Sequence, residues 1–356
     1  MRSFRRKWSP KKRKPWTRSN SPRFNALMAT TTTTVPSAGP ITGSRSFLSR
    51  LRDGDEIARL VTFIFAGSVV LITLLLVFEL WRESYLPRHK FGLGFFVTSV
   101  WDPIFDKFGA LPFIYGTVVT AGVALLIAVP LGIGAAIFLA ELAPARISDT
   151  LQFFIDLLAA VPSVIYGLLG VFVVIPMMRQ YIQPALKSSL GFLPFFQGPA
   201  YGVGFLTAGI VLAIMVIPYI ISVSREVLIS VPRDQREAAL ALGSTRWEST
   251  WKVVLPFART GIMGSIFLAL ARALGETMAV TMVIGNTPTI SASLFSPGYS
   301  IAAVIANEFT EATGDLYLQS LIELGLVLFL LTFLLNGLAR LLIVVTSQRG
   351  SGMGQA

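Results

Sequence analysis

The chain has 356 residues, of which 53% are hydrophobic and only 14% are charged, and its mean hydropathy is +0.68. A soluble globular domain carries about 25% charged residues, so this composition excludes an ordinary soluble fold and indicates a membrane protein. Cysteine is absent and His89 is the only histidine, which excludes disulfide frameworks, thiolate or histidine metal clusters, and Ser-His-Asp catalysis.

The net charge of +11 comes from the N-terminal segment. Residues 1–59 hold 14 of the 30 Lys/Arg residues and 3 of the 19 Asp/Glu residues, which leaves 16 of each in the rest of the chain. The charge therefore marks a basic tail and does not indicate nucleic-acid binding. Residues 1–57 are too polar to fold, and we expect a disordered cytosolic tail. A transit peptide and a true start at Met28 are the alternatives.

Six apolar segments follow this tail, and each is long enough to cross the hydrocarbon core of a membrane, which takes about 20 residues. We therefore predict an all-α integral membrane protein, with a transmembrane domain at residues 58–346 and a short cytosolic tail at residues 347–356. The predicted helices cover residues 60–80, 114–142, 153–178, 202–223, 261–285 and 318–345.

The distribution of Lys and Arg predicts the orientation of these helices. With the N-terminus inside, the inner segments hold 23 of these residues and the outer segments hold 6. Because cytosolic segments are enriched in Lys and Arg, both termini and the loop between the fourth and fifth helices are predicted to be cytosolic.

Two outer connectors, at residues 179–201 and 287–317, are candidate docking surfaces for a soluble partner. The first contains Pro184, Pro194 and Pro199, which favour an irregular conformation over a helix. The second has no basic residue and includes the run Asn307 to Glu311. Both could equally be ordinary connectors.

Small residues and a proline indicate close packing in the second and third helices. Gly132, Gly134 and Ala136 would let helix two approach a neighbour closely. Pro162 and Gly167 fall inside the predicted third helix, and helix breaks in membranes require neighbours that satisfy the freed backbone. We expect the third helix to be buried in the bundle.

The cytosolic loop between helices four and five is predicted to form two short helices separated by a glycine. The first covers residues 232–242 and ends at Gly243, and the second begins near residue 244. Such a compact projection could contact a partner protein, or its amphipathic helix could lie on lipid. Its candidate contact residues are Glu237, Ala238, Ala239, Gly243, Leu255 and Pro256.

The spacing of this loop resembles the signature loop of binding-protein-dependent ABC importer permeases. Glu-Ala-Ala is followed after three residues by Gly, and after nine more by Val253, Val254, Leu255 and Pro256, with Val253 where Ile is usual. The resemblance implies coupling helices that fit a groove on an ATPase subunit. None of the eight lysines follows a glycine, so the chain contains no Walker A motif and ATP would be hydrolysed by another chain.

An arginine and a glutamate lie inside the predicted fifth helix. Placing Arg272 there costs at least about 2.5 to 3.5 kcal/mol, so it should face a partner or a watery cavity. Glu276 follows one turn later, where the two side chains can pair. The guanidinium suits a phosphate-like anion, and Thr277 and Thr281 could add hydroxyl donors, although bonding to their own backbone is commoner. The alternative is an ion pair that only fixes helix packing.

The segment from Ala269 to Asn286 resembles the PstC-type permease subunits of phosphate importers, as do residues 161–167 and 305–309. The resemblance covers about residues 58–346 and implies that Arg272 and Glu276 serve phosphate passage. It also implies a second, PstA-type permease subunit, two ATPase subunits that carry ATP and Mg, a periplasmic phosphate-binding protein, and a place in the bacterial inner membrane. This chain would bind no cofactor. A permease for molybdate or sulfate, and an ion-coupled secondary transporter, are the alternatives.

Overall fold

The computed structural model describes the backbone of residues 55–351 and the side chains of residues 58–341. Regular structure in this part of the chain is helical, apart from a single bridge between Asp102 and Lys107. The predicted N-terminal tail up to residue 54, with the alternative start at Met28, lies outside the described residues, as do residues 352–356. The helices are α3 (Asp55–Glu83), α4 (Tyr85–Phe91), α5 (Gly94–Val97), α6 (Leu111–Ile137), η1 (Phe138–Leu142), α7 (Ala145–Ala159), α8 (Ser163–Leu169), η2 (Gly170–Val174), α9 (Ile175–Met177), η3 (Met178–Ile182), α10 (Gln183–Leu190), η4 (Pro194–Phe196), α11 (Phe205–Ile229), α12 (Arg233–Ala241), α13 (Arg246–Ser249), η5 (Thr250–Val254), α14 (Leu255–Leu274), α15 (Met278–Ile284), α16 (Ile301–Glu308) and α17 (Asp315–Ser351).

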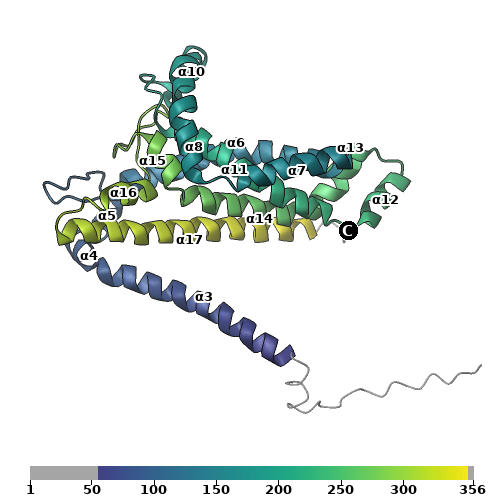
Figure 1. Ribbon diagram of the computed structural model, residues 1–356, viewed down its shortest axis with the longest axis horizontal. Helices are drawn as coiled ribbons and strands as arrows, with labels where there is room; N and C mark the ends of the chain where they lie inside the picture. Colours follow the sequence, from purple (N-terminus) through teal and green to yellow (C-terminus); the bar gives the residue numbers. More distant parts are fainter. Residues whose placement is uncertain (1–54, 352–356) are drawn as a thin grey trace, which may run out of the picture. The chain divides into compact units, whose positions relative to one another are not determined.

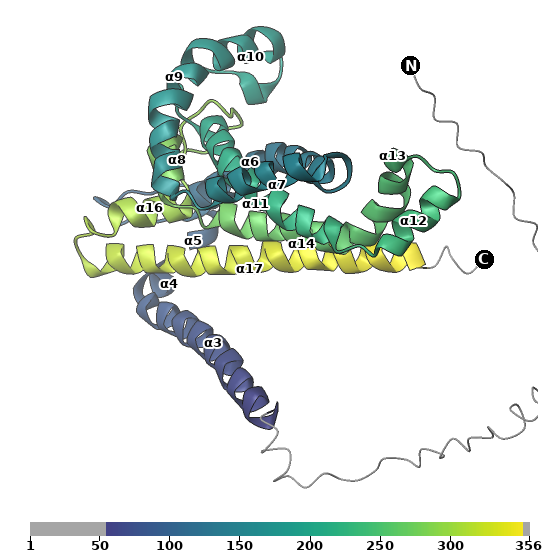
Figure 2. The ribbon, with the colours of Figure 1, turned by 45° about the vertical axis from the view of Figure 1, so that its right-hand side comes forward.

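The chain divides into two units, residues 1–68 and residues 69–356. The described part of the first unit is the beginning of α3, and the second unit contains the other helices. Within the second unit, α6, α11, α14 and α17 run in a bundle (Figure 1). Helices α12 and α13 lie at one end of this bundle, and α4, α5 and α16 lie at the other (Figure 2).

Six helical segments among the described residues are long and apolar enough to span a membrane, as the sequence predicts. The protein is therefore a multi-pass α-helical membrane protein. The six segments cover residues 58–83, 111–142, 163–190, 205–229, 246–274 and 315–341.

Helix α11 is the centre of the bundle. In its most apolar stretch 67% of the residues are buried, against 33% or less for the other spans. Gly132 of α6 is one reason for this close packing, because a Cβ atom there would lie 2.7 Å from Ile220 of α11. The predicted role of small residues is confirmed for Gly132 and for the fully buried Ala136, whereas Gly134 faces open space.

The third span differs from its prediction of residues 153–178. Helix α7 ends at Ala159, Pro162 has an extended ψ of 141°, and the span begins at Ser163. The break follows from Pro162, because a proline disfavours helical geometry in the residue before it. The break separates α7, which packs beside α11, from a span that continues to Leu190.

The fifth span was also predicted wrongly, as a continuous helix over residues 261–285. Helix α14 ends at Leu274, and α15 begins at Met278 after a break at residues 275–277. Gly275 follows the last residue of α14, a position where glycine commonly ends a helix. Upstream, the helical path extends back to Arg246 through α13 and η5.

The prediction of an irregular connector at residues 179–201 is wrong up to residue 190. Helix α10 occupies Gln183–Leu190, continues directly from η3 and has Pro184 as its second residue. The π-helical segment η3 ends two residues before Pro184, and η2 and η5 end two residues before Pro176 and Pro256. A π-helical turn widens the helix where the proline ring would otherwise clash with the preceding turn.

Candidate functional site

Arg272 lies in the last turn of α14, next to the break in the fifth span. Its guanidinium carbon lies 4.5 Å from the centre of the Tyr219 ring of α11. The Arg272 Nε atom is buried and has no hydrogen-bond partner, while the side chain as a whole is partly exposed. The cation is therefore held by an aromatic face and by the negative end of the α14 dipole, and its hydrogen-bond donors stay available.

Glu276 does not pair with Arg272, contrary to the prediction. Its Oε1 atom accepts a hydrogen bond of 3.3 Å from the backbone N–H of Ala279, in the first turn of α15. Among the described residues no ion pair joins Arg272 to a carboxylate. The spacing of four residues brings side chains together only on a continuous helix, and here the helix ends between them. Glu276 therefore stabilises the start of α15.

The hydroxyls of Thr277 and Thr281 bond to backbone carbonyls. Thr277 Oγ1 donates to the carbonyl of Gly275 at 3.4 Å, and Thr281 Oγ1 donates to the carbonyl of Thr277 at 2.8 Å. Both bonds stabilise the break and the turn that follows it. The structure thus brings the four predicted residues to one interrupted segment, but it gives Arg272 alone a free set of donors among them.

The motif at residues 161–167 packs directly against α15. A Cβ atom on Gly167 would lie 2.5 Å from Met282 Sδ and 3.2 Å from the Cα atom of Ala279, so only glycine allows this approach. Tyr166 donates from its hydroxyl to the carbonyl of Leu158 at 2.7 Å and so ties α8 to α7 across the break. Two of the three segments that resemble phosphate permeases, residues 161–167 and 269–286, therefore pack against each other.

The loop after α11 contains the two predicted short helices, α12 and α13. Gly243 lies between them with φ +87°, a conformation that favours glycine. Thr245 and Glu248 form a reciprocal capping box at the start of α13. Leu242, Trp247 and Trp251 are strongly exposed, and the two tryptophan rings lie 5.6 Å apart.

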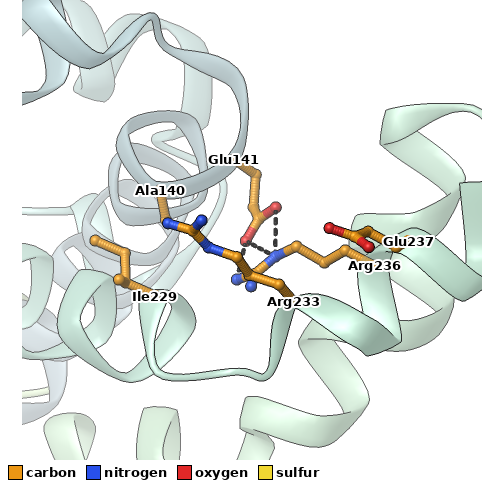
Figure 3. Close-up of a pocket in the computed structure, with 6 residues that line it drawn as sticks. All are labelled: Ala140, Glu141, Ile229, Arg233, Arg236 and Glu237. Atoms are coloured by element: carbon orange, nitrogen blue, oxygen red, sulfur yellow. Dashed lines mark hydrogen bonds and ion pairs between the residues drawn. The ribbon is translucent and has the colours of Figure 1, made fainter.

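An ion pair fixes α12 to the end of the second span. Arg236 Nη2 lies 2.8 Å from Glu141 Oε1, and both side chains are mostly buried (Figure 3). Arg236 also donates two hydrogen bonds of 2.6 Å, to the carbonyls of Leu228 and Val231. These three partners lie on η1, on α11 and just after α11. Arg236 therefore joins three elements, and the sequence analysis missed this role.

A cavity of about 350 Å³ lies beside this ion pair and is lined by Arg233 and Glu237 of α12 in addition to the pair. Figure 3 shows these side chains around the opening. Of the predicted contact residues, Glu237 and Ala238 are exposed and Ala239 is buried. Leu255 begins α14 and Pro256 lies in its first turn, as expected for the entry into the fifth span.

Asn307 and Glu308, candidates for an outer docking surface, make contacts inside the protein. Glu308 Oε2 accepts hydrogen bonds from Trp101 Nε1 at 2.9 Å and from the Tyr317 hydroxyl at 2.7 Å. Asn307 Nδ2 donates to the hydroxyl of Tyr299 at 3.1 Å. Burial raises the pKa of Tyr299, so this hydroxyl stays neutral. The two polar residues stabilise the end of the bundle around the connector at residues 98–110.

These features define a class of protein. It is a multi-pass helical membrane protein in which one span is interrupted next to an arginine that no acidic side chain pairs with among the described residues, and two short helices project at one end of its bundle. The chain belongs to the family described as binding-protein-dependent transport system inner membrane component, whose model matches residues 128–344. The matched residues include both Arg272 and the projecting loop.

Curated relatives carry a narrower name. The "Phosphate transport system permease protein PstC" of Mesorhizobium japonicum is 48% identical over 285 residues, which cover 78% of this chain and 87% of the relative. The proteins of that name from Xylella fastidiosa (strain Temecula1) and Haemophilus influenzae are 51% and 46% identical and cover 72% and 83% of this chain, and 81% and 94% of those relatives. Among solved structures, an inward-facing MetNI methionine ABC transporter matches with a TM-score of 0.47 and 16% identity, covering 68% of this chain and 98% of that one.

Proposed function

We propose that this protein is the transmembrane permease subunit of an ATP-driven importer for inorganic phosphate. The observation that carries the proposal is the similarity to relatives named phosphate transport permeases, at 46–51% identity over most of both chains. The chain is a transporter subunit and not an enzyme, because ATP hydrolysis in such systems belongs to a separate subunit. It binds no cofactor itself, and ATP and Mg are held by that partner.

Arg272 is the residue that we assign to phosphate passage. Its guanidinium offers a planar set of donors that matches an oxyanion, and no acidic side chain among the described residues neutralises it. The ring of Tyr219 and the end of α14 hold the charge in place without occupying those donors. In this proposal the break next to Arg272 is held in its conformation by Glu276, Thr277 and Thr281.

Helices α12 and α13 are the proposed contact with the ATPase. Their exposed surface combines the charged Glu237 with the apolar Leu242 and Trp247, the composition of a protein contact with an apolar centre and a polar rim. The ion pair between Arg236 and Glu141 would transmit movement of this loop to the second and fourth spans. Ala238, Ala239, Gly243, Leu255 and Pro256 set the shape of the loop.

The complete importer, as we propose it, contains a second permease of the PstA type, two ATPase subunits and a periplasmic phosphate-binding protein. It lies in the bacterial inner membrane, and both termini of this chain are cytosolic. This orientation follows from the excess of Lys and Arg on one side of the six spans. It places α12 and α13 in the cytosol, where ATP is available.

Phosphate uptake tests this proposal directly. Cells that lack their own high-affinity system would express the full importer with this chain intact, with Arg272→Gln, or with the control Arg340→Gln, which changes an exposed arginine of α17. We expect the intact chain and the control to restore uptake of radiolabelled phosphate, and we expect Arg272→Gln to assemble without restoring it. If the intact, assembled importer carries molybdate or sulfate instead of phosphate, the substrate assignment is wrong.

A further inference from the structure

A buried carboxylate in α17 has no role in the passage described above. The side chain of Glu323 is 2% exposed, and its Oε2 atom is buried without a hydrogen-bond partner among the described residues. It directly precedes residues 324–339, which contain no ionisable side chain, so it lies at the polar edge of a long apolar stretch. A buried, unpartnered carboxylate is costly and needs a compensating group.

Glu323 lines a cavity of about 410 Å³ between the start of α17 and the segment from α4 to α5. The rest of the lining is apolar, with the rings of Trp81 and Phe96 and the side chains of Leu326 and Leu330, except for Arg88. The cavity thus contains one acidic group, one basic group and an apolar wall. All of these residues belong to the second unit of the chain.

Arg88 is held beside the cavity without pairing with Glu323. Its guanidinium carbon lies 3.7 Å from the centre of the Trp81 ring, Nε donates to the carbonyl of Ser84 at 3.1 Å, and Nη2 donates to the carbonyl of Trp81. In the described part of the chain these contacts leave the Arg88 Nη1 atom available. The acidic and the basic side chain are therefore not paired with each other, and each has a hydrogen-bonding atom without a partner among the described residues.

We propose that this cavity binds the headgroup of a phospholipid that carries a primary amine, such as phosphatidylethanolamine. The ammonium would donate to Glu323 Oε2, the phosphate would accept from Arg88 Nη1, and an acyl chain would lie along Leu326 and Leu330. A headgroup of this kind has one positive and one negative charge joined to a long apolar tail, which complements the cavity group by group. The proposal rests on the membrane location of the protein and not on its substrate.

Lipid retained by the purified, complete importer tests this site. The complex would be extracted from membranes that contain phosphatidylethanolamine and phosphatidylglycerol, and the bound lipids would be quantified by mass spectrometry. We expect Glu323→Gln to lower the retained phosphatidylethanolamine about tenfold, because one charge-assisted hydrogen bond is lost. Glu311→Gln, which changes an exposed acid, is the matched control and should retain the lipid.

A second arm separates the amine from other headgroups. The delipidated complex would be placed in phosphatidylglycerol vesicles, and phosphatidylethanolamine or phosphatidylcholine would be added. We expect strong rebinding of the first lipid and weak rebinding of the second, whose quaternary ammonium has no N–H to donate. Equal rebinding of both lipids, or unchanged retention by a folded Glu323→Gln complex with a normal melting temperature, would overturn the proposal.

Discussion

At the residue scale, the position of Arg272 depends on how its charge is compensated. An arginine at the centre of a membrane helix costs at least about 2.5 to 3.5 kcal/mol, and a carboxylate one turn away would offset part of that cost. The structure uses the face of Tyr219 and the carbonyl end of α14 instead. This difference matters chemically, because a carboxylate would occupy the donors that an anion requires.

Tyr219 should therefore be a positioning residue for phosphate passage. We expect Tyr219→Phe to keep nearly normal uptake, because the aromatic face is preserved, and Tyr219→Leu to reduce the uptake rate about tenfold. A desolvated cation–π contact contributes about 1 to 2 kcal/mol, which corresponds to that factor. Uptake measured against phosphate concentration in assembled complexes checks this expectation. Equal loss in both variants would point to the hydroxyl and contradict the role of the ring.

A second prediction concerns Arg236, whose ion pair with Glu141 fixes α12 to the second span. Removing one partner of a buried ion pair costs about 3 to 5 kcal/mol, and the partial exposure of this pair lowers the value to roughly 2 to 3 kcal/mol. We expect Arg236→Gln to lower the melting temperature of the complex and to weaken its association with the ATPase. Arg233→Gln, on the same helix and beside the same cavity but exposed, is the control for the melting temperature. A normal melting temperature for Arg236→Gln would show that the pair is dispensable.

At the element scale, the prolines explain where the helices change their winding. Three π-helical segments each end two residues before a proline that continues in a helix, and the third of them, η5, connects α13 to α14. A π-helical turn inserts one extra residue relative to a regular α-helix, so it rotates everything before it by about 100° around the axis. Pro256 therefore sets the direction in which α12 and α13 project.

Replacing this proline should change coupling more than stability. In Pro256→Ala the N–H of residue 256 returns, and we expect η5 to relax to a regular α-helix and turn the loop away from its contact. Phosphate-stimulated ATPase activity of the reconstituted importer should fall, while the melting temperature stays normal or rises. Pro184→Ala, after η3 in the third span, serves as the comparison and should leave ATPase activity unchanged.

The sequence predicted the elements better than their boundaries. Six spans and two short loop helices follow from apolar length and from Gly243, and both are confirmed. The breaks at residues 160–162 and 275–277 were missed because the apolar stretches on either side of each break add up to the length of one span, and hydropathy does not register a backbone turn. The local signals were present in Pro162 and Gly275, but both residues also occur within continuous membrane helices.

At the scale of the whole molecule, contacts between segments that are distant along the chain could not be predicted from the sequence. The pairing of Arg272 with Glu276 followed from their spacing, whereas the actual partner, Tyr219, lies 53 positions away on another helix. Arg236 and Glu141 are 95 positions apart, and Trp101 and Glu308 are 207 positions apart. A single sequence reports periodicity within an element, and only the packing of elements decides which polar groups meet.

The exposed apolar residues of the loop between α11 and α14 predict how the whole molecule associates with the ATPase. We expect Leu242→Asp, at a side chain that is 90% exposed, to remove the ATPase from the purified complex by placing a charge in an apolar contact. The fold should be unaffected, since Leu242 makes little contact within the chain. Leu93→Asp, at a similarly exposed leucine that directly precedes α5, should leave the ATPase bound. Co-purification of the two subunits measures both outcomes.

The partial exposure of the Arg272 side chain predicts where mutations that compensate for its loss should arise. In the importer proposed above, such a side chain would form one wall of the passage, and the second permease would form the opposite wall. Cargo preference is then a shared trait of two genes. Mutations that restore uptake to variants with changes around Arg272 should accordingly arise in the gene of the second permease as readily as in the gene of this chain.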